Sequence, residues 1–367
     1  MPVRGAEERR TSGSLSPRLV RPIPKAMPFP LFDKMILPSP VRRLVTHGNG
    51  NELWLKDDSH IHPIYGGNKC RKLARLLPEA GRKGVARVTT FGTAGSHHVL
   101  ATGLLAQACG FSVRAFVISQ PWSQHAEQVL RASVASGIEL VPVNSLQQAL
   151  TAVSRLTDSG AWIPPGGTNI CGSLGYFDAV CELAAQIQRG EVPEPDWIVV
   201  PFGTGGTAAG LLAGVAMTGL GSKVLGVSVV KIAGRTWVAH RIAGRILRLA
   251  DSRRRVGASK LVVTTQWLGG GYGKQARDGV MATERAQSFD LPLDPSYTAK
   301  AFAGAWALLE GTKLNNYDGR SPTMPPVPQK ILYWHTLSAP CQLESTPSGA
   351  ALLPRPLGSL LRPCPRS

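Results

Sequence analysis

The stretch VVPFGTGGTAAGLLAG, residues 199–214, joins a hydrophobic strand to a helix of small residues through a turn of glycine and threonine. Backbone N–H groups at such a turn point into one concavity, and the dipole of the following helix adds partial positive charge there. The stretch has neither the GK[ST] of a Walker P-loop nor the GxGxxG spacing of a first βα unit. We therefore expect a phosphate-binding loop formed by Gly203, Thr204, Gly205, Gly206 and Thr207. A plain tight turn is the alternative.

Apolar strand-like segments alternate with helix-like segments on both sides of this loop. Residues 85–92 (VARVTTFG), 112–119 (SVRAFVIS) and 223–231 (KVLGVSVVK) are expected strands, each followed by a turn and a helix-like run. Residues 330–336 (KILYWHT) form the last expected strand. This alternation is typical of parallel sheets with helices on both faces, so the sequence predicts an α/β fold.

The charge of the chain is strongly positive and concentrated at its ends. Of the net charge of +18, residues 1–43 contribute nine Lys/Arg against three acids, and residues 319–367 contribute five against one. A basic excess can attract nucleic acid, but no zinc-finger spacing, RNA-binding aromatic signature or sustained basic helix accompanies it. We therefore expect anionic small molecules as ligands, and no nucleic-acid partner.

The cysteines and the N-terminus limit the class of protein further. No two of the six cysteines form a CxxC pair, so neither a disulfide framework nor a zinc site is predicted. The N-terminus has no apolar signal-peptide core, and no apolar stretch is long enough to span a bilayer. The expected setting is the cytoplasm, with no membrane partner and no metal.

A lysine at the start of a predicted helix is the second chemical signal. Residues 65–77 read YGGNKCRKLARLL, so Lys69 follows two glycines and an asparagine. In an apolar pocket an ammonium group is desolvated, its pKa falls, and the free amine becomes a nucleophile toward an aldehyde. An ordinary surface lysine is the alternative. A single ligand needs both a phosphate cradle and an imine-forming lysine, namely pyridoxal 5′-phosphate, and we expect the glycines to leave room for its flat ring.

Six motifs resemble, in the same order, those of the 1-aminocyclopropane-1-carboxylate deaminase/D-cysteine desulfhydrase family. They are YGGNKCRKLARLL, GTAGSHHVLATGLLAQACG, IPPGGTNICGSLGYFDAVCEL, FGTGGTAAGLLAG, GGGYG and LDPSYTAKAFAGAWALLEG, and the resemblance covers about residues 35 to 336. It implies the tryptophan synthase β-like fold of fold-type II pyridoxal-phosphate enzymes. In that fold two open parallel-sheet α/β domains hold the cofactor in the cleft between them.

The domain division expected from this resemblance is discontinuous. Residues 31–71 and 186–339 would form the larger, cofactor-binding domain, and residues 72–185 the smaller α/β domain. Residues 1–30 are rich in Pro, Arg and Ser and are expected to be a flexible tail. Residues 340–367 form a second tail whose order the sequence does not define. Relatives of this fold are commonly dimers, which implies a homodimer.

The resemblance also implies roles for individual residues. Lys69 matches the Schiff-base lysine, and Asn68 helps to shape the cofactor pocket. Ser96 matches a serine that contacts the substrate carboxylate or assists proton transfer, although a helix N-cap is an alternative reading of it. Tyr272 and Tyr297 match two active-site tyrosines, with packing against the core as the alternative.

Thr298 and His97 distinguish this chain within the family. The residue at position 298 faces the pyridine nitrogen in the family, and deaminases have an acid there that strengthens the electron sink for opening a cyclopropane. Thr298 can only hydrogen bond to that nitrogen, which suffices for β-elimination. His97 replaces an asparagine that meets the ring or its phenolic oxygen; a polar loop histidine is the alternative. After Trp334 and His335 the chain also departs from the glycines usual in the family.

The predicted function is a β-elimination lyase that acts on a small amino acid. Lys69 or Tyr297 would remove the α-proton, and D-cysteine would yield pyruvate, hydrogen sulfide and ammonia. The alternatives are a 1-aminocyclopropane-1-carboxylate deaminase and a non-catalytic relative that binds the cofactor, the latter because of His97 and the altered C-terminal region.

Overall fold

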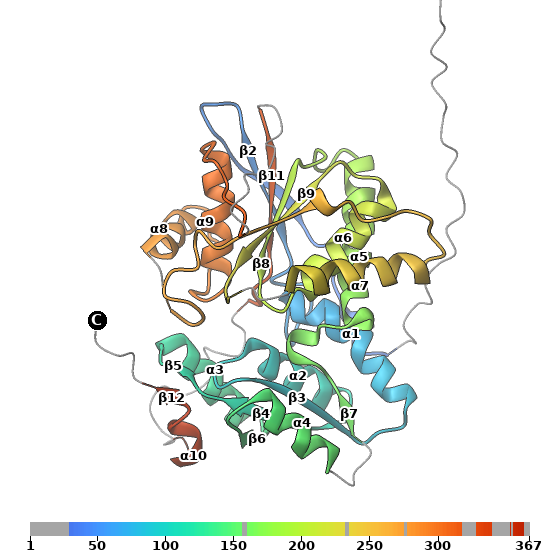
Figure 1. Cartoon of the computed structure of the whole chain (residues 1–367), viewed down its shortest axis with the longest axis vertical. Helices are drawn as coiled ribbons and strands as arrows, with labels where there is room; N and C mark the ends of the chain where they lie inside the picture. The colour runs from blue at the N-terminus through green and yellow to red at the C-terminus, as the bar shows by residue number, and fades with distance from the viewer. Residues whose placement is uncertain are drawn as a thin grey trace, which may run out of the picture.

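The described part of the chain is built around two main sheets, each flanked by helices (Figure 1). The computed structural model describes residues 29–155, 160–231, 235–274, 277–317, 328–339, 353 and 355–362. The predicted tail over residues 1–30 lies outside the described residues except at its last two positions. No helix in the described ranges is long and apolar enough to cross a membrane.

The larger sheet has six strands in the order β1-β2-β11-β8-β9-β10. Its strands are β1 (Val41–Thr46), β2 (Glu52–Asp57), β11 (Lys330–His335), β8 (Trp197–Phe202), β9 (Lys223–Ser228) and β10 (Leu261–Thr264). β1 and β2 are antiparallel, and every other pair in this sheet is parallel. The expected last strand is therefore confirmed, and it lies at the centre of the sheet between β2 and β8.

Helices cover both faces of the larger sheet. One face packs against α5 (Ile170–Gln188), α6 (Gly206–Thr218) and α7 (Arg235–Leu249), and the other against α8 (Arg277–Gln287) and α9 (Thr298–Leu309). Side chains alternate between the two cores along β8, because Ile198 and Val200 belong to the first core and Trp197 and Val199 to the second. A strand buried on both faces has the continuous apolar sequence that marks this segment.

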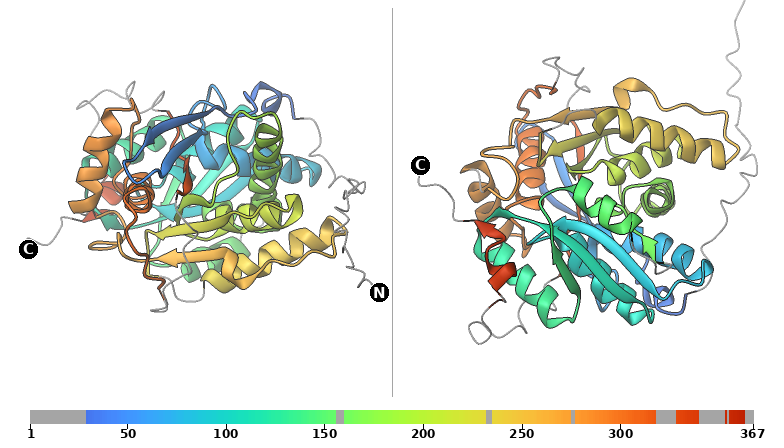
Figure 2. Two further views of the ribbon diagram at one scale, coloured as in Figure 1. Left: turned by 90° about the horizontal axis from the view of Figure 1, so that it is seen from above. Right: turned by 60° about the horizontal axis from the view of Figure 1, so that its bottom comes forward.

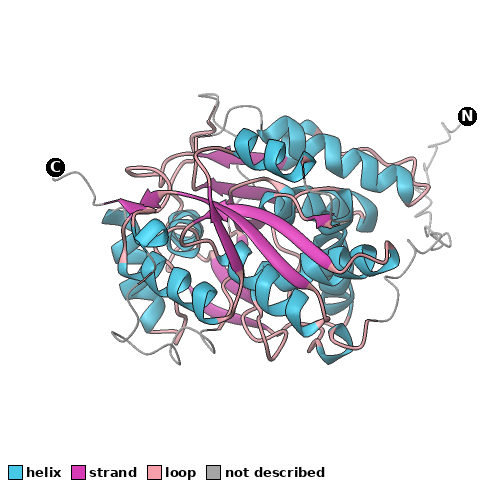
Figure 3. Ribbon diagram, turned by 90° about the horizontal axis from the view of Figure 1, so that it is seen from below, coloured by secondary structure: helices cyan, strands magenta, loops and turns pink. Residues whose placement is uncertain are grey.

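The smaller sheet is entirely parallel, in the order β6-β4-β3-β7. Its strands are β6 (Glu139–Pro142), β4 (Ser112–Ile118), β3 (Arg87–Thr93) and β7 (Ala161–Trp162). The helices α1 (Gly67–Arg82), α2 (His97–Ala108) and α3 (Gln124–Ala135) share one core with it, and α4 (Leu146–Ser154) contributes to a small core on the other face. Figure 2 and Figure 3 show these strands from other sides, with helices around them.

Short elements complete the described chain. They are the 3-10 turns η1 (Phe32–Lys34), η2 (Pro165–Gly167) and η3 (Ala258–Lys260), the strands β5 (Gln120–Pro121) and β12 (Leu361–Arg362), and the helix α10 (Arg355–Gly358). β12 pairs with β5 in parallel, and the core that contains residues of α2 and α3 also contains Leu357, Leu360 and Leu361. Part of the expected C-terminal tail therefore packs on the smaller sheet, and the rest lies outside the described residues.

A buried ionic cluster joins α1 and α5 to the larger sheet. Arg71 donates to both carboxylate oxygens of Asp58, at 2.8 and 2.7 Å, and to Glu182. Lys56 donates to Glu182 at 2.7 Å, so each charge has a partner of opposite sign. The expected domain boundary at residue 185 lies within α5, and α5 packs on the larger sheet. The division into domains stays a prediction.

Candidate active site

A cavity of about 330 Å³ lies at the carboxyl ends of strands from both sheets. Thr93 ends β3, Ile118 ends β4, Pro201 is near the end of β8, and Thr336 follows β11; all four line the cavity. Ligands of open α/β sheets bind at this edge. Every site residue predicted from the sequence lines this one cavity: Asn68, Lys69, Ser96, His97, Gly203, Thr204, Gly205, Gly206, Thr207, Tyr272, Tyr297 and Thr298.

Lys69 lies in the first turn of α1, with its amine in the cavity. Burial lowers the pKa of Lys69 to about 8, and the negative charge of Asp294 opposes this shift only in part. Its Nζ is 6.0 Å from the ring centroid of Tyr297. An amine with this pKa is present in its free form at neutral pH far more than an exposed lysine, as a nucleophile requires.

The two glycines before Lys69 serve a purpose other than the one expected. A Cβ on Gly66 would lie 1.9 Å from the carbonyl oxygen of Ser59, and one on Gly67 would lie 2.4 Å from the carbonyl oxygen of Thr336. The expectation that they leave room for a ring is therefore wrong, because backbone occupies that space. Gly67 also has a φ of +68°, which favours glycine.

The segment after β11 holds the start of α1 in place. The backbone N–H of Asn68 donates to Thr336 O at 3.1 Å, and that of Gly66 donates to Ser338 Oγ at 2.9 Å. Thr336, Leu337 and Ser338 also line the cavity. The stretch where the sequence departs from the family pattern thus positions the helix that carries Lys69.

The predicted phosphate loop forms the N-terminus of α6. Gly205 has a φ of +87°, and no side chain caps the first turn of the helix. A Cβ on Gly206 would lie 2.6 Å from Thr168 Oγ1 and 3.0 Å from Lys72 Nζ. The Thr168 hydroxyl and the Lys72 amine therefore lie beside the uncapped N-terminus of α6, where backbone N–H groups favour a phosphate.

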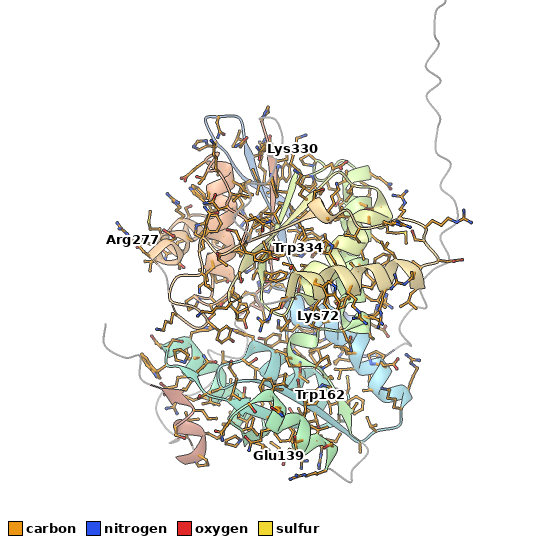
Figure 4. The ribbon with its side chains drawn as sticks, viewed as in Figure 1. Lys72, Glu139, Trp162, Arg277, Lys330 and Trp334 are labelled. Atoms are coloured by element: carbon orange, nitrogen blue, oxygen red, sulfur yellow. The ribbon has the colours of Figure 1, made fainter. Side chains whose placement is uncertain are left out.

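Lys72 and Thr168 are members of this cradle that the sequence reasoning missed. Lys72 lies on α1 three residues after Lys69, and its Nζ donates to Gly166 O at 3.0 Å. Thr168 Oγ1 lies 2.6 Å from Thr204 Oγ1. Figure 4 shows Lys72 at the level where the two sheets face each other. The spacing of three residues on one helix face was the available signal for Lys72; Thr168 had none.

Ser96 and His97 lie at the start of α2. Ser96 Oγ accepts a hydrogen bond from the backbone N–H of Val99 at 3.4 Å, so the N-cap reading holds while the residue also lines the cavity. His97 Nδ1 lies 2.6 Å from the hydroxyl of Tyr65, and its Nε2 lies 2.7 Å from Nε2 of His125. His97 is thus hydrogen-bonded at both nitrogens, and neither partner could be predicted from the sequence.

The two predicted tyrosines are in contact. The Tyr297 hydroxyl donates to that of Tyr272 at 3.0 Å, and Tyr272 lies 3.2 Å from Thr93 Oγ1 at the end of β3. Burial raises the pKa of both phenols above the ordinary value. They are therefore protonated at neutral pH and act as hydrogen-bond donors, which leaves Lys69 as the stronger candidate base.

Asp294 uses its carboxylate to cap α9. It accepts hydrogen bonds from the backbone N–H groups of Ser296, Tyr297 and Thr298 and from Thr298 Oγ1. Burial raises its pKa, but the imidazoles of His97 and His125 and the bonds from Thr298 outweigh this, so the pKa lies below the ordinary value. The Thr298 hydroxyl proton is engaged with Asp294, and its contact with a pyridine nitrogen stays a prediction.

A family model described as pyridoxal-phosphate dependent enzyme matches residues 33–318. The chain belongs to the family of pyridoxal-phosphate-dependent enzymes. Its fold-type II architecture and its cofactor, as expected from the sequence, are confirmed. The residues of the cavity fit this cofactor, because a lysine with a lowered pKa and a cradle for phosphate face the same space.

Relatives of this pyridoxal-phosphate-dependent enzyme carry two kinds of name. It is 29% identical over 304 residues to a Thermotoga maritima protein named "Putative 1-aminocyclopropane-1-carboxylate deaminase", covering 77% of this chain and 93% of the relative. It is 27% identical over 328 residues to a D-cysteine desulfhydrase of Klebsiella pneumoniae, covering 85% and 95%. The crystal structure of a 1-aminocyclopropane-1-carboxylate deaminase homologue superposes with a TM-score of 0.70 and 26% identity, covering 92% of this chain and 99% of that one.

Proposed function

We propose that this enzyme catalyses β-elimination on a small amino acid, with D-cysteine as the substrate and pyruvate, hydrogen sulfide and ammonia as products. The observation that carries the proposal is that the neutral Thr298 lines the cavity. The neighbouring Asp294 has no lone pair left to accept a further hydrogen bond. A carboxylate has about four lone-pair sites, and Asp294 accepts four hydrogen bonds from its own helix start. Neither side chain therefore offers a free carboxylate to the pyridine nitrogen, which a strong electron sink needs.

Residues of the cavity take the α-proton, bind the substrate carboxylate and orient the substrate. Pyridoxal phosphate, when bound, withdraws electrons from the α-carbon of the substrate. Lys69 Nζ, which is free amine in part at neutral pH, takes the α-proton. The first turn of α2 with Ser96 binds the substrate carboxylate, since N–H groups at a helix start favour an anion. The protonated hydroxyls of Tyr297 and Tyr272 orient the substrate.

A substrate panel tests this proposal. The cofactor-loaded enzyme is supplied with D-cysteine, L-cysteine or 1-aminocyclopropane-1-carboxylate while sulfide and 2-oxo acids are measured. We expect sulfide and pyruvate from D-cysteine, and loss of both with Lys69→Ala. Lys83→Ala, which changes an exposed lysine at the C-terminal end of the same helix, is the matched control and keeps full activity.

Two other results would give different functions. Production of 2-oxobutanoate from 1-aminocyclopropane-1-carboxylate would assign the deaminase activity that some relatives' names carry. Bound cofactor without turnover of any amino acid in the panel would identify a non-catalytic relative. In either case the β-elimination proposal would be abandoned.

A further inference from the structure

Three aromatic side chains form one hydrogen-bonded line that leads out of the cavity. Tyr65 precedes α1, His97 begins α2, and His125 lies in the first turn of α3. The hydroxyl of Tyr65 is 2.6 Å from His97 Nδ1, and His97 Nε2 is 2.7 Å from His125 Nε2. Tyr65 and His97 line the cavity, whereas His125 is half-buried and does not line it.

The distances determine how protons are shared in this line. Two imidazole nitrogens 2.7 Å apart hold one proton between them, because two N–H groups cannot point at each other. Burial, the adjacent His125 and the charge of Lys69 lower the pKa of His97 to about 3, with only Asp294 opposing them. His97 is therefore neutral at pH 7 and carries a single N–H.

A neutral His97 allows two arrangements of the same line. In the first, the Tyr65 hydroxyl donates to His97 Nδ1, and His97 Nε2–H donates to His125. In the second, His125 Nε2–H donates to His97 Nε2, and His97 Nδ1–H donates to the Tyr65 oxygen. The heavy atoms are in the same places in both arrangements, so only protons must move to convert one into the other.

We propose that Tyr65, His97 and His125 form a proton relay that delivers a proton from solvent to the sulfur leaving the substrate. The proposal rests on the β-elimination function given above. Tyr65 is the catalytic residue of the relay, and His97 and His125 transmit the proton. The hydrogen bond between His97 and His125 connects the cavity to a half-buried histidine outside it.

One passage of protons along the line protonates the leaving sulfur. As the carbon–sulfur bond breaks, its electron pair goes to sulfur, and the Tyr65 hydroxyl gives sulfur a proton. The Tyr65 oxygen takes the Nδ1 proton of His97, His97 Nε2 takes the Nε2 proton of His125, and His125 Nδ1 takes a proton from water. One proton enters the line at His125 and one leaves it at Tyr65, and the second arrangement becomes the first. The reverse passage, which carries out the proton that Lys69 took from the substrate, restores the second.

His125→Ala is the central variant, because His125 is outside the cavity and its loss leaves the substrate site intact. We expect kcat to fall at least about tenfold, with KM changed by less than about twofold. Added imidazole should restore turnover of this variant in proportion to its concentration, since it can occupy the vacated place and carry the proton. Tyr65→Phe should lose as much activity but show no rescue.

His240→Ala is the matched control. His240 is another half-buried histidine, on α7, and it does not line the cavity. This variant should keep wild-type kcat and give no response to imidazole. A structural role for His125 would produce no rescue, so the rescue separates transfer of a proton from support of the fold.

Nuclear magnetic resonance reports on the line without any turnover. In cofactor-loaded protein with 15N-labelled histidine, we expect coupling between two imidazole nitrogens through a shared proton, lost in His125→Ala. Wild-type kcat in His125→Ala, or a fall without imidazole rescue, would overturn the relay. If the wild type turned over no amino acid, the proposed function would fail, and absence of the coupling would then overturn the shared proton independently.

Discussion

Lys72 is a single residue with a role that can be isolated. Its ammonium lies 3.0 Å from the place that a Cβ on Gly206 would occupy, at the start of α6. Burial and the nearby Lys69 lower its pKa, and a bound phosphate dianion would favour its charged form. We therefore propose that Lys72 binds the phosphate of the cofactor and that Lys69 bonds to its carbonyl carbon.

Lys72→Ala should weaken binding of pyridoxal 5′-phosphate by about 10- to 100-fold, because a hydrogen bond to a charged group is worth about 1.5–3 kcal/mol. Binding of pyridoxal, which has no phosphate, should change little. Absorbance titrations with both compounds measure this, with Lys83→Ala as control. An equal loss for both compounds would contradict a phosphate role.

Lys69 should give stability a defined pH dependence. Its pKa is about 8 in the folded chain and 10.5 in an exposed lysine, so between these values the unfolded chain binds more protons. The free energy of unfolding of cofactor-free protein should therefore rise with pH from 8 to 10.5, by at most about 1.4 kcal/mol per pH unit from this residue. Urea unfolding at several pH values should show a steeper rise in wild type than in Lys69→Met; equal slopes would contradict the buried lysine.

The start of α1 shows how an element is fixed by a distant segment. Gly67 approaches Thr336 so closely that a side chain there must displace the loop after β11. Gly84 has a similar φ, +64°, but nothing lies within 4 Å of a Cβ placed on it. Alanine substitutions at these two glycines therefore separate the free-energy cost of the backbone conformation from that of a steric clash.

Gly84→Ala should cost about 1–2 kcal/mol of unfolding free energy, from its left-handed conformation alone. Gly67→Ala should cost clearly more and should also weaken cofactor binding, because the turn that carries Lys69 moves. Urea denaturation and cofactor titration of both variants measure these effects. Equal losses of stability, with unchanged cofactor binding in Gly67→Ala, would contradict a steric clash between residue 67 and the loop after β11.

Across the whole molecule, the features that could be predicted from the sequence are those encoded by residues adjacent in the chain. The continuous apolar run of β8 predicts a buried parallel strand, which is present, and the glycine turn after it lies at the start of α6. Binding of phosphate by that turn stays a prediction. Lys69 could be singled out because its glycines and its helix start are adjacent to it. The alternating pattern also identified β11, which lies far from its sheet neighbours in the chain.

Contacts between distant segments could not be predicted in this way. His125 follows no motif, and it reaches His97 only because α2 and α3 pack side by side. The roles of Gly66 and Gly67 were misread because the neighbouring backbone comes from residues near 59 and 336. The expected homodimer stays a prediction, since a single chain is described.

Two neighbouring lysines, Lys69 and Lys72, lie in the cavity, and we expect only Lys69 to bond to the cofactor. Reduction of the loaded enzyme with borohydride fixes the cofactor to its lysine, and mass spectrometry of the peptides then locates it. We expect the phosphopyridoxyl group on Lys69 and none on Lys72. Its presence on Lys72, or on any lysine outside the cavity, would contradict the proposed role of Lys69.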